Sequence, residues 1–524
     1  MNEQPVLTSS DRLGSVGDST SKTPAFVSVP PLSPRFMRSS SKFKWALCKK
    51  TRNADGSDRH KCTTIHSGKI IDALSLMENA KSNSNMNEKQ THPLITHTEE
   101  PDSTSQTFAD ETIPPDDPPP IRNLSSTFKI KLPLGISIAI YILPVVLTAL
   151  FYLLRINPSI MSWVTLRISA PIRGFMANLT SVIPLSITEV LFTAVGIWLI
   201  YYIIKTIKAV IRGQNKLKTL SKQLLFIAVL ALYFWSAFSW LWSSGYHAPG
   251  FSERNGFYRS GVNADDLIAT TSFFAKMANE LAPQVARDSE GNFTEPINEL
   301  FTASTGIYEN IAMVYPCLNG TLYRPKPMGY SWVMSRMGYT GMYFALTGEA
   351  NINTMTPRAS LPVTLAHEHA HQLGVHAEDE ASFVAILACI KSDNTAFAYS
   401  GYLSGLNYLL RAMSQAISRA NHEKLYDVGA EIMLAQTIIL DSLAPEVRRD
   451  RWNSYEFWLS QRTVNTGIGF LDNALTTVNE VVSDAVDAAY DSFLKSQNQS
   501  LGLQSYGACV DLLVEYYTRF HPHF

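Results

Sequence analysis

Residues 361–374, LPVTLAHEHAHQLG, place two histidines four positions apart, with a glutamate directly after the first of them. These residues are His367, Glu368 and His371. In a helix, positions i and i+4 lie on one face, where two imidazoles can bind the same metal ion. The glutamate then lies next to the ion without binding it, and its carboxylate can take a proton from a water molecule. The stretch therefore predicts a helix that carries a zinc site, with Glu368 as general base.

The residues around this motif set the ends of the predicted helix. Ser360 can cap the first turn, and Pro362 suits that turn. Gly374 can adopt the left-handed conformation that ends helices, which lets the chain turn back toward the metal ion. His369 lies about 200° around the helix from His367. We therefore expect His369 to be a surface residue, or one that contacts the metal site only indirectly.

A catalytic zinc ion takes three protein ligands, so the motif lacks one. The polar residues that follow the predicted helix are the candidates: His376, Glu378, Asp379 and Glu380. The spacing HExxHxxGxxH would require a histidine at position 377, but this residue is Ala377. A second helix that begins at Glu378 would present a glutamate to the ion, so we expect Glu378 as the third ligand, with Glu380 as the alternative. These two lie about 200° apart on a helix, so they cannot both face one ion.

Composition narrows the class of protein. The chain has 524 residues, with 44 Lys and Arg against 45 Asp and Glu, which gives a formal net charge of −1. This balance argues against a nucleic-acid-binding protein that relies on bulk positive charge, so no nucleic-acid partner is expected. The five cysteines form no CxxC pair, so neither a disulfide scaffold nor a zinc ribbon is predicted.

The first half of the chain is divided by composition. Residues 1–127 are rich in Ser, Thr, Pro, Asn and Asp, which predicts a disordered N-terminal tail. Residues 128–245 form a predicted transmembrane region, with apolar runs at 132–154, 183–204 and 224–242. Runs of this length can cross the apolar core of a bilayer. We therefore expect a multi-pass protein of the cell membrane, with the lipid bilayer as one partner.

The charges of the short loops predict the orientation in the membrane. The loop between the second and third runs is rich in cations: Lys205, Lys208, Arg212, Lys216, Lys218 and Lys222. Such loops stay on the cytoplasmic side. With three spans, the N-terminus is then cytoplasmic and residues 246–524 are extracytoplasmic.

Residues 246–524 are expected to form one soluble, mostly helical domain. Asn263 offers capping chemistry at the start of one helix. Residues 339–348, YTGMYFALTG, are rich in β-forming residues and bounded by glycines, so a strand or hairpin is predicted shortly before the HExxH helix. The predicted fold class is mainly α, with three transmembrane helices followed by this domain and its small β element.

Several stretches resemble one family. Residues 341–353 (GMYFALTGEANIN), 361–374, 378–383 (EDEASF) and 500–506 (SLGLQSY) follow the pattern of DUF3810, a family of bacterial membrane proteins. The resemblance extends from about the first predicted span to position 507. It implies N-terminal transmembrane helices joined to a zincin-like HExxH domain of the gluzincin type. Where the family usually has Asn, this chain has Ser382. By similarity to zinc peptidases generally, the strand before the motif would be an edge strand that pairs with an extended substrate.

These features predict a membrane-anchored zinc metallopeptidase that hydrolyses peptide or protein substrates. The alternative is a membrane protein that holds zinc for a structural or sensory role and cleaves nothing, although such a site would not need Glu368. Tyr343, Arg448 and Tyr506 are possible oxyanion-stabilising residues, and no spacing argument separates them. The sequence does not indicate the substrate or the oligomeric state.

Overall fold

The computed structural model describes residues 46–52, 58–64, 134–213, 215–257, 261–463, 469–497, 499 and 508–520. The described residues from Leu134 onward belong to one compact unit, and the two strands that precede them belong to another. These strands, β1 (Ala46–Arg52) and β2 (Asp58–Thr64), pair antiparallel. No regular structure was expected there, but the connecting sequence contains Asp55-Gly56, a pair that favours hairpin turns. The rest of the predicted tail lies outside the described residues.

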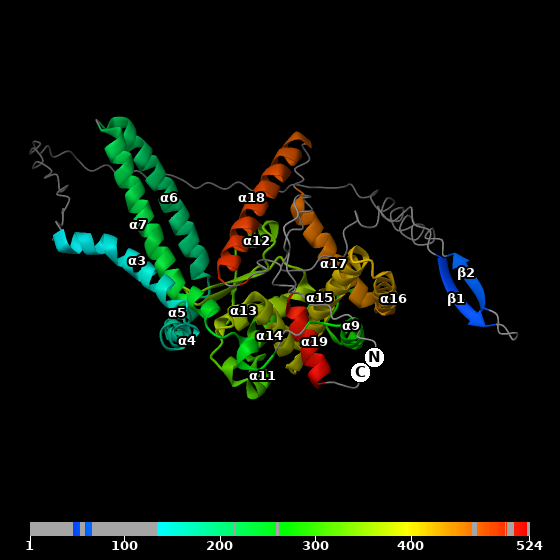
Figure 1. Ribbon diagram of the computed structural model, residues 1–524. Helices are drawn as coiled ribbons and strands as arrows, with labels where there is room; N and C mark the ends of the chain where they lie inside the picture. Colours follow the sequence, from blue (N-terminus) through cyan, green and yellow to red (C-terminus); the bar gives the residue numbers. More distant parts are fainter. Residues whose placement is uncertain are drawn as a thin grey trace, which may run out of the picture. The chain divides into compact units, whose positions relative to one another are not determined.

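The unit that begins at Leu134 is mainly helical, as predicted, with one small mixed sheet (Figure 1). Its α-helices are α3 (Leu134–Leu154), α4 (Pro158–Val164), α5 (Ala170–Ser181), α6 (Ile187–Arg212), α7 (Lys216–Leu241), α8 (Phe251–Arg254), α9 (Ala264–Leu281), α10 (Ile297–Ala303), α11 (Glu309–Val314), α12 (Ser331–Arg336), α13 (Leu361–Gln372), α14 (Glu378–Lys391), α15 (Thr395–His422), α16 (Tyr426–Ser442), α17 (Pro445–Arg462), α18 (Gly469–Ser496) and α19 (Cys509–Phe520). A π-helical turn (Thr165–Ser169) joins α4 to α5.

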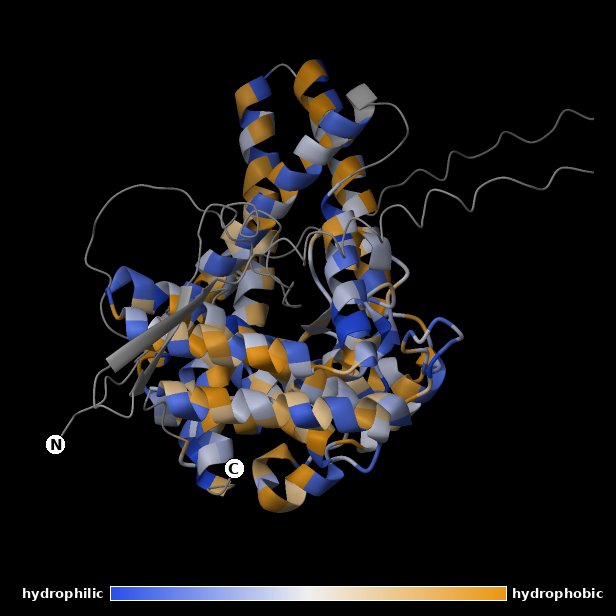
Figure 2. Cartoon of the chain, turned by 90° about the vertical axis from the view of Figure 1, so that its right-hand side faces the viewer, coloured by the Kyte–Doolittle hydropathy of each residue, from blue (hydrophilic) through white to orange (hydrophobic). Residues whose placement is uncertain are grey.

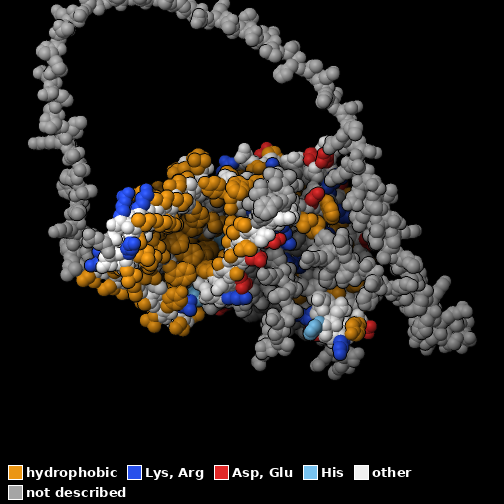
Figure 3. Space-filling view, turned by 90° about the horizontal axis from the view of Figure 1, so that it is seen from above, with side chains coloured by type: hydrophobic (Ala, Val, Ile, Leu, Met, Phe, Trp, Pro, Cys, Tyr) orange, Lys and Arg blue, Asp and Glu red, His pale blue; other side chains and the backbone are white. Residues whose placement is uncertain are grey.

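Two helices are long and apolar enough to cross a membrane. They are α6 and α7, each of 26 residues, and only 6% and 11% of their most apolar windows are buried. Figure 3 shows hydrophobic side chains over most of this part of the visible surface, with Lys and Arg grouped at its outer end. Since apolar side chains exposed over such a length need a lipid environment, these helices indicate a membrane protein.

The first predicted span corresponds to α3. Its described apolar part, Ile138–Leu154, is shorter than α6 and α7. At 1.5 Å per residue it covers about 25 Å, somewhat less than the apolar core of a bilayer. Tyr233 donates to the carbonyl of Ile140, and Trp240 donates to the carbonyl of Leu147. From the first pair to the second, the residue number rises on both helices, so α3 and α7 run parallel.

The core of the helical domain surrounds α14 and α15. Helix α14 is buried from Glu378 to Cys389, and α15 packs against α9, α13, α14, α16 and α19. The predicted cap of α9 is confirmed, because the Asn263 side chain accepts a hydrogen bond from the backbone of Asp266. Figure 2 shows that hydrophobic residues also recur along the helices that project from this domain.

The sheet has three short strands in the order β3 (Lys326–Pro327), β5 (Glu349–Ile352) and β4 (Gly341–Phe344). Strand β4 pairs antiparallel with β5, so the glycine-bounded segment forms a hairpin as predicted, and β4 is an edge strand. The other edge strand, β3, is parallel to β5. Both α5 and α6 contact β5, which places the sheet beside the candidate membrane helices.

Candidate metal centre

Helix α13 carries the HExxH motif at a fixed position in the core. Ser360 does not cap it, because this residue continues a 3₁₀ turn and its hydroxyl donates to the carbonyl of Pro357. Instead, the hydroxyl of Ser400 on α15 accepts from the backbone of Val363 at 3.1 Å. The start of α13 is therefore tied to the central helix of the domain rather than to a local cap.

The helix ends at Gly374, as the sequence predicts. This glycine has a φ of +89°, its N–H donates to the carbonyl of His371, and the N–H of Val375 donates to the carbonyl of Ala370. These two bonds form a Schellman motif, which reverses the chain direction after the helix. The chain then enters α14 at Glu378, so the first turn of α14 lies against the histidines of α13.

His367, His371 and Glu378 form a buried group that could hold a metal ion. One potential ligand atom from each residue lies within 4.8 Å of the others. Glu378 Oε2 is 3.2 Å from His367 Nε2 and 3.3 Å from His371 Nε2. Two imidazole nitrogens and one carboxylate oxygen that converge in this way fit the donor set of a catalytic zinc site.

The second nitrogen of each imidazole has its own partner. His371 Nδ1 lies 2.7 Å from the carbonyl of Val375 and can only donate to it, which leaves Nε2 free to face the group. His367 Nδ1 lies 3.4 Å from the Ser382 hydroxyl. Such outer contacts fix the orientation and tautomer of metal-binding histidines.

The charges of the group are strongly coupled. Burial lowers the pKa of His371, but the attraction of Glu378 outweighs it and raises this pKa to about 9. Burial raises the pKa of Glu378, but His371 and His367 together hold it well below its usual range. In the metal-free protein the carboxylate is thus ionised and held by the imidazoles.

Glu368 lies beside this group with one oxygen unoccupied. The residue is 4% exposed, and its Oε2 has no hydrogen-bond partner among the described residues. Burial raises its pKa to about 8, and a hydrogen bond from the backbone of Tyr343 acts in the opposite direction. A buried acceptor without a partner is costly, so this oxygen fits a position that a water molecule or substrate fills.

Strand β4 passes directly over Glu368. A Cβ built on Gly341 would lie 2.4 Å from Glu368 Oε1, so only glycine fits there without a shift. The N–H of Asn353 donates to the carbonyl of Thr340. This bond sets which residues hydrogen-bond to β5: the backbone groups of Thr340, Met342 and Phe344 point toward β5. Gly341 and Tyr343 therefore direct their backbone groups away from β5, toward the edge that pairs with no other described strand.

The other candidate ligands lie elsewhere. Glu380 accepts from the backbone of Phe251 at 2.7 Å and from the backbone and hydroxyl of Ser252, so it caps α8. His376 is 2.9 Å from Arg173 Nη1, and burial and Arg173 together hold its pKa well below its usual range.

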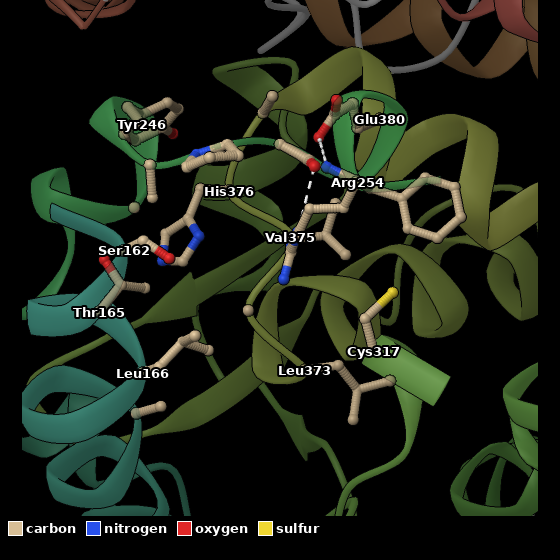
Figure 4. A pocket seen from close by; sticks show the side chains of 18 of the residues that line it. Ser162, Thr165, Leu166, Tyr246, Arg254, Cys317, Leu373, Val375, His376 and Glu380 are labelled. Carbon is tan, nitrogen blue, oxygen red and sulfur yellow. Dashed lines mark hydrogen bonds between the residues drawn. The ribbon is translucent and has the colours of Figure 1, made fainter. Parts of the chain in front are cut away.

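These two residues line a separate cavity of about 250 Å³, together with Asp379 (Figure 4). The lining of that cavity does not include His367, His371 or Glu378. The structure thus brings Glu378, and not Glu380, to the two histidines.

His369 is buried rather than at the surface. Its side chain has no exposed area, its Nε2 lies 3.0 Å from the Ser304 hydroxyl, and its Nδ1 lies 3.3 Å from Gln372 Oε1. Burial lowers its pKa to about 4. It points away from the metal group as expected, but into the core, because helix α13 is enclosed on both sides.

Two residues near the group were not predicted. Tyr490 on α18 donates its hydroxyl to Glu378 Oε1 at 2.8 Å, and the ring of Trp242, after α7, lies 5.5 Å from the ring of His371. Among the oxyanion candidates, Tyr343 packs against Trp242. Arg448 donates to carbonyls at the end of α16. Tyr506 lies outside the described residues.

Comparison with known proteins identifies the family. A family model described as "Protein of unknown function (DUF3810)" matches residues 166–514, which is most of the chain. The chain belongs to the DUF3810 family. The DUF3810 match begins in the π-helical turn between α4 and α5, which lies after the first predicted span. No curated protein and no solved structure matches the chain significantly.

Proposed function

We propose that this DUF3810 protein is a membrane-anchored zinc metallopeptidase. The observation that carries the proposal is the free Oε2 of buried Glu368 beside the converging His367, His371 and Glu378. A site that only held zinc for structural reasons would not need a buried carboxylate with an open oxygen at its edge. Zinc, when bound there, supplies Lewis-acid activation of water and of the scissile carbonyl.

Glu368 is the proton carrier of this reaction. Its Oε2 accepts a proton from the attacking water and later delivers it to the leaving amine. Burial raises the pKa of Glu368 in the metal-free protein, and a cation bound at the neighbouring group would favour the ionised form that the first step requires.

The edge strand β4 positions the substrate. An extended peptide can add to the unpaired edge and use the outward backbone groups of Gly341 and the carbonyl of Tyr343, whose N–H is directed at Glu368. Since Gly341 already lies against Glu368, a peptide bound to this edge passes close to the catalytic carboxylate. Binding through the backbone gives a peptidase affinity for many sequences.

The proposed topology has three spans, with the N-terminus in the cytoplasm and the domain outside. The cationic residues at the α6–α7 connection support a cytoplasmic position for that end of the pair. The parallel direction of α3 and α7 supports α3 as a span in addition to α6 and α7, because the first and third of three spans cross the membrane in the same sense. The proposed units are then the tail (1–127), the transmembrane region (128–245) and the extracytoplasmic domain (246–524).

Hydrolysis of an unfolded protein tests the proposal. The full chain in detergent or nanodiscs, loaded with zinc, is incubated with casein, and the same assay is run with Glu368→Gln. We expect cleavage by the native chain only, with equal zinc content in both proteins. Equal zinc with no turnover in either protein, on casein and on a membrane-anchored polypeptide alike, would instead indicate a structural or sensory metal site.

A further inference from the structure

The candidate metal centre rests directly on the membrane helices. Trp242 is the first residue after α7, and its ring lies 5.5 Å from that of His371 and 5.2 Å from that of Tyr343 on β4. At the end of β4, the ring of Phe344 lies 5.2 Å from that of Phe192 on α6. The proposed substrate strand and a proposed ligand thus both contact the helix pair that enters the bilayer.

The sheet cannot move away from these helices without losing buried bonds. Glu349 of β5 accepts from the backbone N–H groups of Ile187 and Thr188 at 3.1 and 2.8 Å, and so caps α6. Asn351 accepts from the Ser186 hydroxyl at 2.7 Å. A carboxylate at a helix N-terminus is favoured by the backbone N–H groups and by the helix dipole. The hairpin is therefore held at the foot of α6.

Exposed apolar residues of α6 and α7 begin close to this foot. Val190 on α6 is 52% exposed, and Phe234 on α7 is 49% exposed. From Phe234 to Trp242 the helix rises about 12 Å, and from Ile187 to Val190 it rises about 5 Å. The exposed apolar surface of α7 therefore begins about two helical turns from Trp242, whose ring contacts His371.

A third helix flanks the metal group on the membrane side. Helix α18 reaches Glu378 through Tyr490, and its Phe493 ring lies 5.7 Å from the ring of Phe238 on α7. Figures 1 and 2 show α18 projecting from the same side of the domain as α6 and α7. Val478, Val481 and Val482 form an exposed apolar stripe along it. The metal group thus lies beside three projecting helices, α6, α7 and α18, that carry exposed apolar residues.

We propose that the substrates are extended polypeptide segments that lie at the bilayer surface, next to their own membrane anchor. This inference rests on the proposed peptidase function and specifies its substrate class. A segment that leaves the bilayer beside α6 can run along β4 and pass Glu368 within a few residues of the membrane. A segment far from its anchor, or a soluble protein, has no such guided path.

The first test maps cleavage positions in nanodiscs. The reconstituted, zinc-loaded chain is given a pool of substrates with one transmembrane helix, followed on the extracytoplasmic side by a randomised segment of about 60 residues. All peptide bonds of one substrate are held at the membrane by the same anchor. A higher local concentration of substrate therefore cannot explain why the bonds near the anchor are cut more often than the distant ones. Mass spectrometry of the products should place most cuts in the first ten or so residues after the anchor, at least tenfold above the distal positions.

The outcomes separate the two proposals. Cuts spread evenly along the segment, or equal cleavage of the same pool without its anchor, would overturn the substrate class while leaving the peptidase function intact. No cuts above those of Glu368→Gln, at full zinc loading, would overturn the peptidase function and this inference with it.

The second test measures depth and needs no activity. A spin label is placed at Met342 on β4, or at Met313 on α11, in a background without the native cysteines. Met313 is 77% exposed, and α11 lies away from the projecting helices (Figure 1). Lipid-dissolved oxygen should relax the Met342 label several-fold more than the Met313 label. Equal relaxation of the two labels would contradict a site at the bilayer surface.

Discussion

The hydroxyl of Tyr490 donates to Glu378 Oε1 at 2.8 Å, while the other oxygen, Oε2, faces His367 and His371. The carboxylate of Glu378 is thus shared between a tyrosine on α18 and the two histidines on α13. The tyrosine occupies the outer oxygen and leaves one oxygen directed at the position of the ion. This arrangement makes α18 part of the support of the site.

Removal of this hydroxyl should weaken metal binding without unfolding the protein. Tyr490→Phe frees Glu378 Oε1, and contacts of this kind typically change metal affinity about 10- to 100-fold. Competition titration with a zinc chelator measures the change. Tyr455→Phe is the matched control, since the Tyr455 hydroxyl is buried with no hydrogen-bond partner among the described residues. Equal zinc affinity of the Tyr490 variant and the control would show that the contact is incidental.

The third ligand is tested by a pair of glutamates. Glu378→Ala should lose most zinc affinity, because it removes the only carboxylate of the group. Glu380→Ala should keep zinc, but it leaves the backbone N–H groups of Phe251 and Ser252 without their acceptor. We expect it to reduce the free energy of unfolding by about 1–3 kcal/mol. Zinc titration and thermal unfolding of both variants decide the matter, and loss of zinc only in Glu380→Ala would reverse the assignment.

Gly341 should be essential for activity and dispensable for metal binding. In Gly341→Ala the new methyl group meets Glu368 Oε1 and must displace that carboxylate. A displacement of about 1 Å at a catalytic group can cost about 100-fold in rate. Hydrolysis and zinc content are measured together, with Gly174→Ala as control, since a Cβ on Gly174 meets nothing within 4 Å. Full activity of Gly341→Ala would mean that Glu368 does not act from this position.

The buried imidazole of His369 should make the fold sensitive to acid. Its pKa is about 4 in the folded protein, below its ordinary value of 6.5. The unfolded chain therefore binds the proton first, so this stability is complete above pH 6.5 and is lost as the pH falls toward 4. The loss amounts to about 3 kcal/mol. Unfolding of the metal-free chain and of His369→Gln is followed over this range, and the variant should show the shallower decline. Parallel pH profiles would contradict the assignment.

The local part of the site was accessible from the sequence. The spacing of His367 and His371, the helix end at Gly374 and the glutamate at the start of the next helix all depend on the geometry of one short segment. The β4–β5 hairpin could likewise be predicted from its glycine-bounded, β-forming residues, whereas the direction of the backbone groups along β4 could not. The capping role of Ser360 was wrong, because Ser400 from α15 reaches the first turn instead.

The long-range part was not accessible. Tyr490 is 112 positions from Glu378, and nothing in the pattern of α18 marks it as different from other apolar positions. The ends of the membrane helices also differ from the apolar runs. Helix α6 begins at Ile187 because Ser186 caps it, and it continues through the basic residues to Arg212. Apolar runs mark the part that fits the bilayer, whereas caps mark the ends of the helix.

The most direct test of the account is the zinc-edge X-ray absorption spectrum of the purified full chain. We expect one zinc ion per chain, with two imidazole nitrogens at about 2.0–2.1 Å and oxygen ligands at about 2.0–2.2 Å. The spectrum should persist in Glu368→Gln, which is inactive, and the ion should be lost in Glu378→Ala. A chain that binds no zinc, or a spectrum that Glu378→Ala leaves unchanged, would contradict the assignment of His367, His371 and Glu378 as a metal centre.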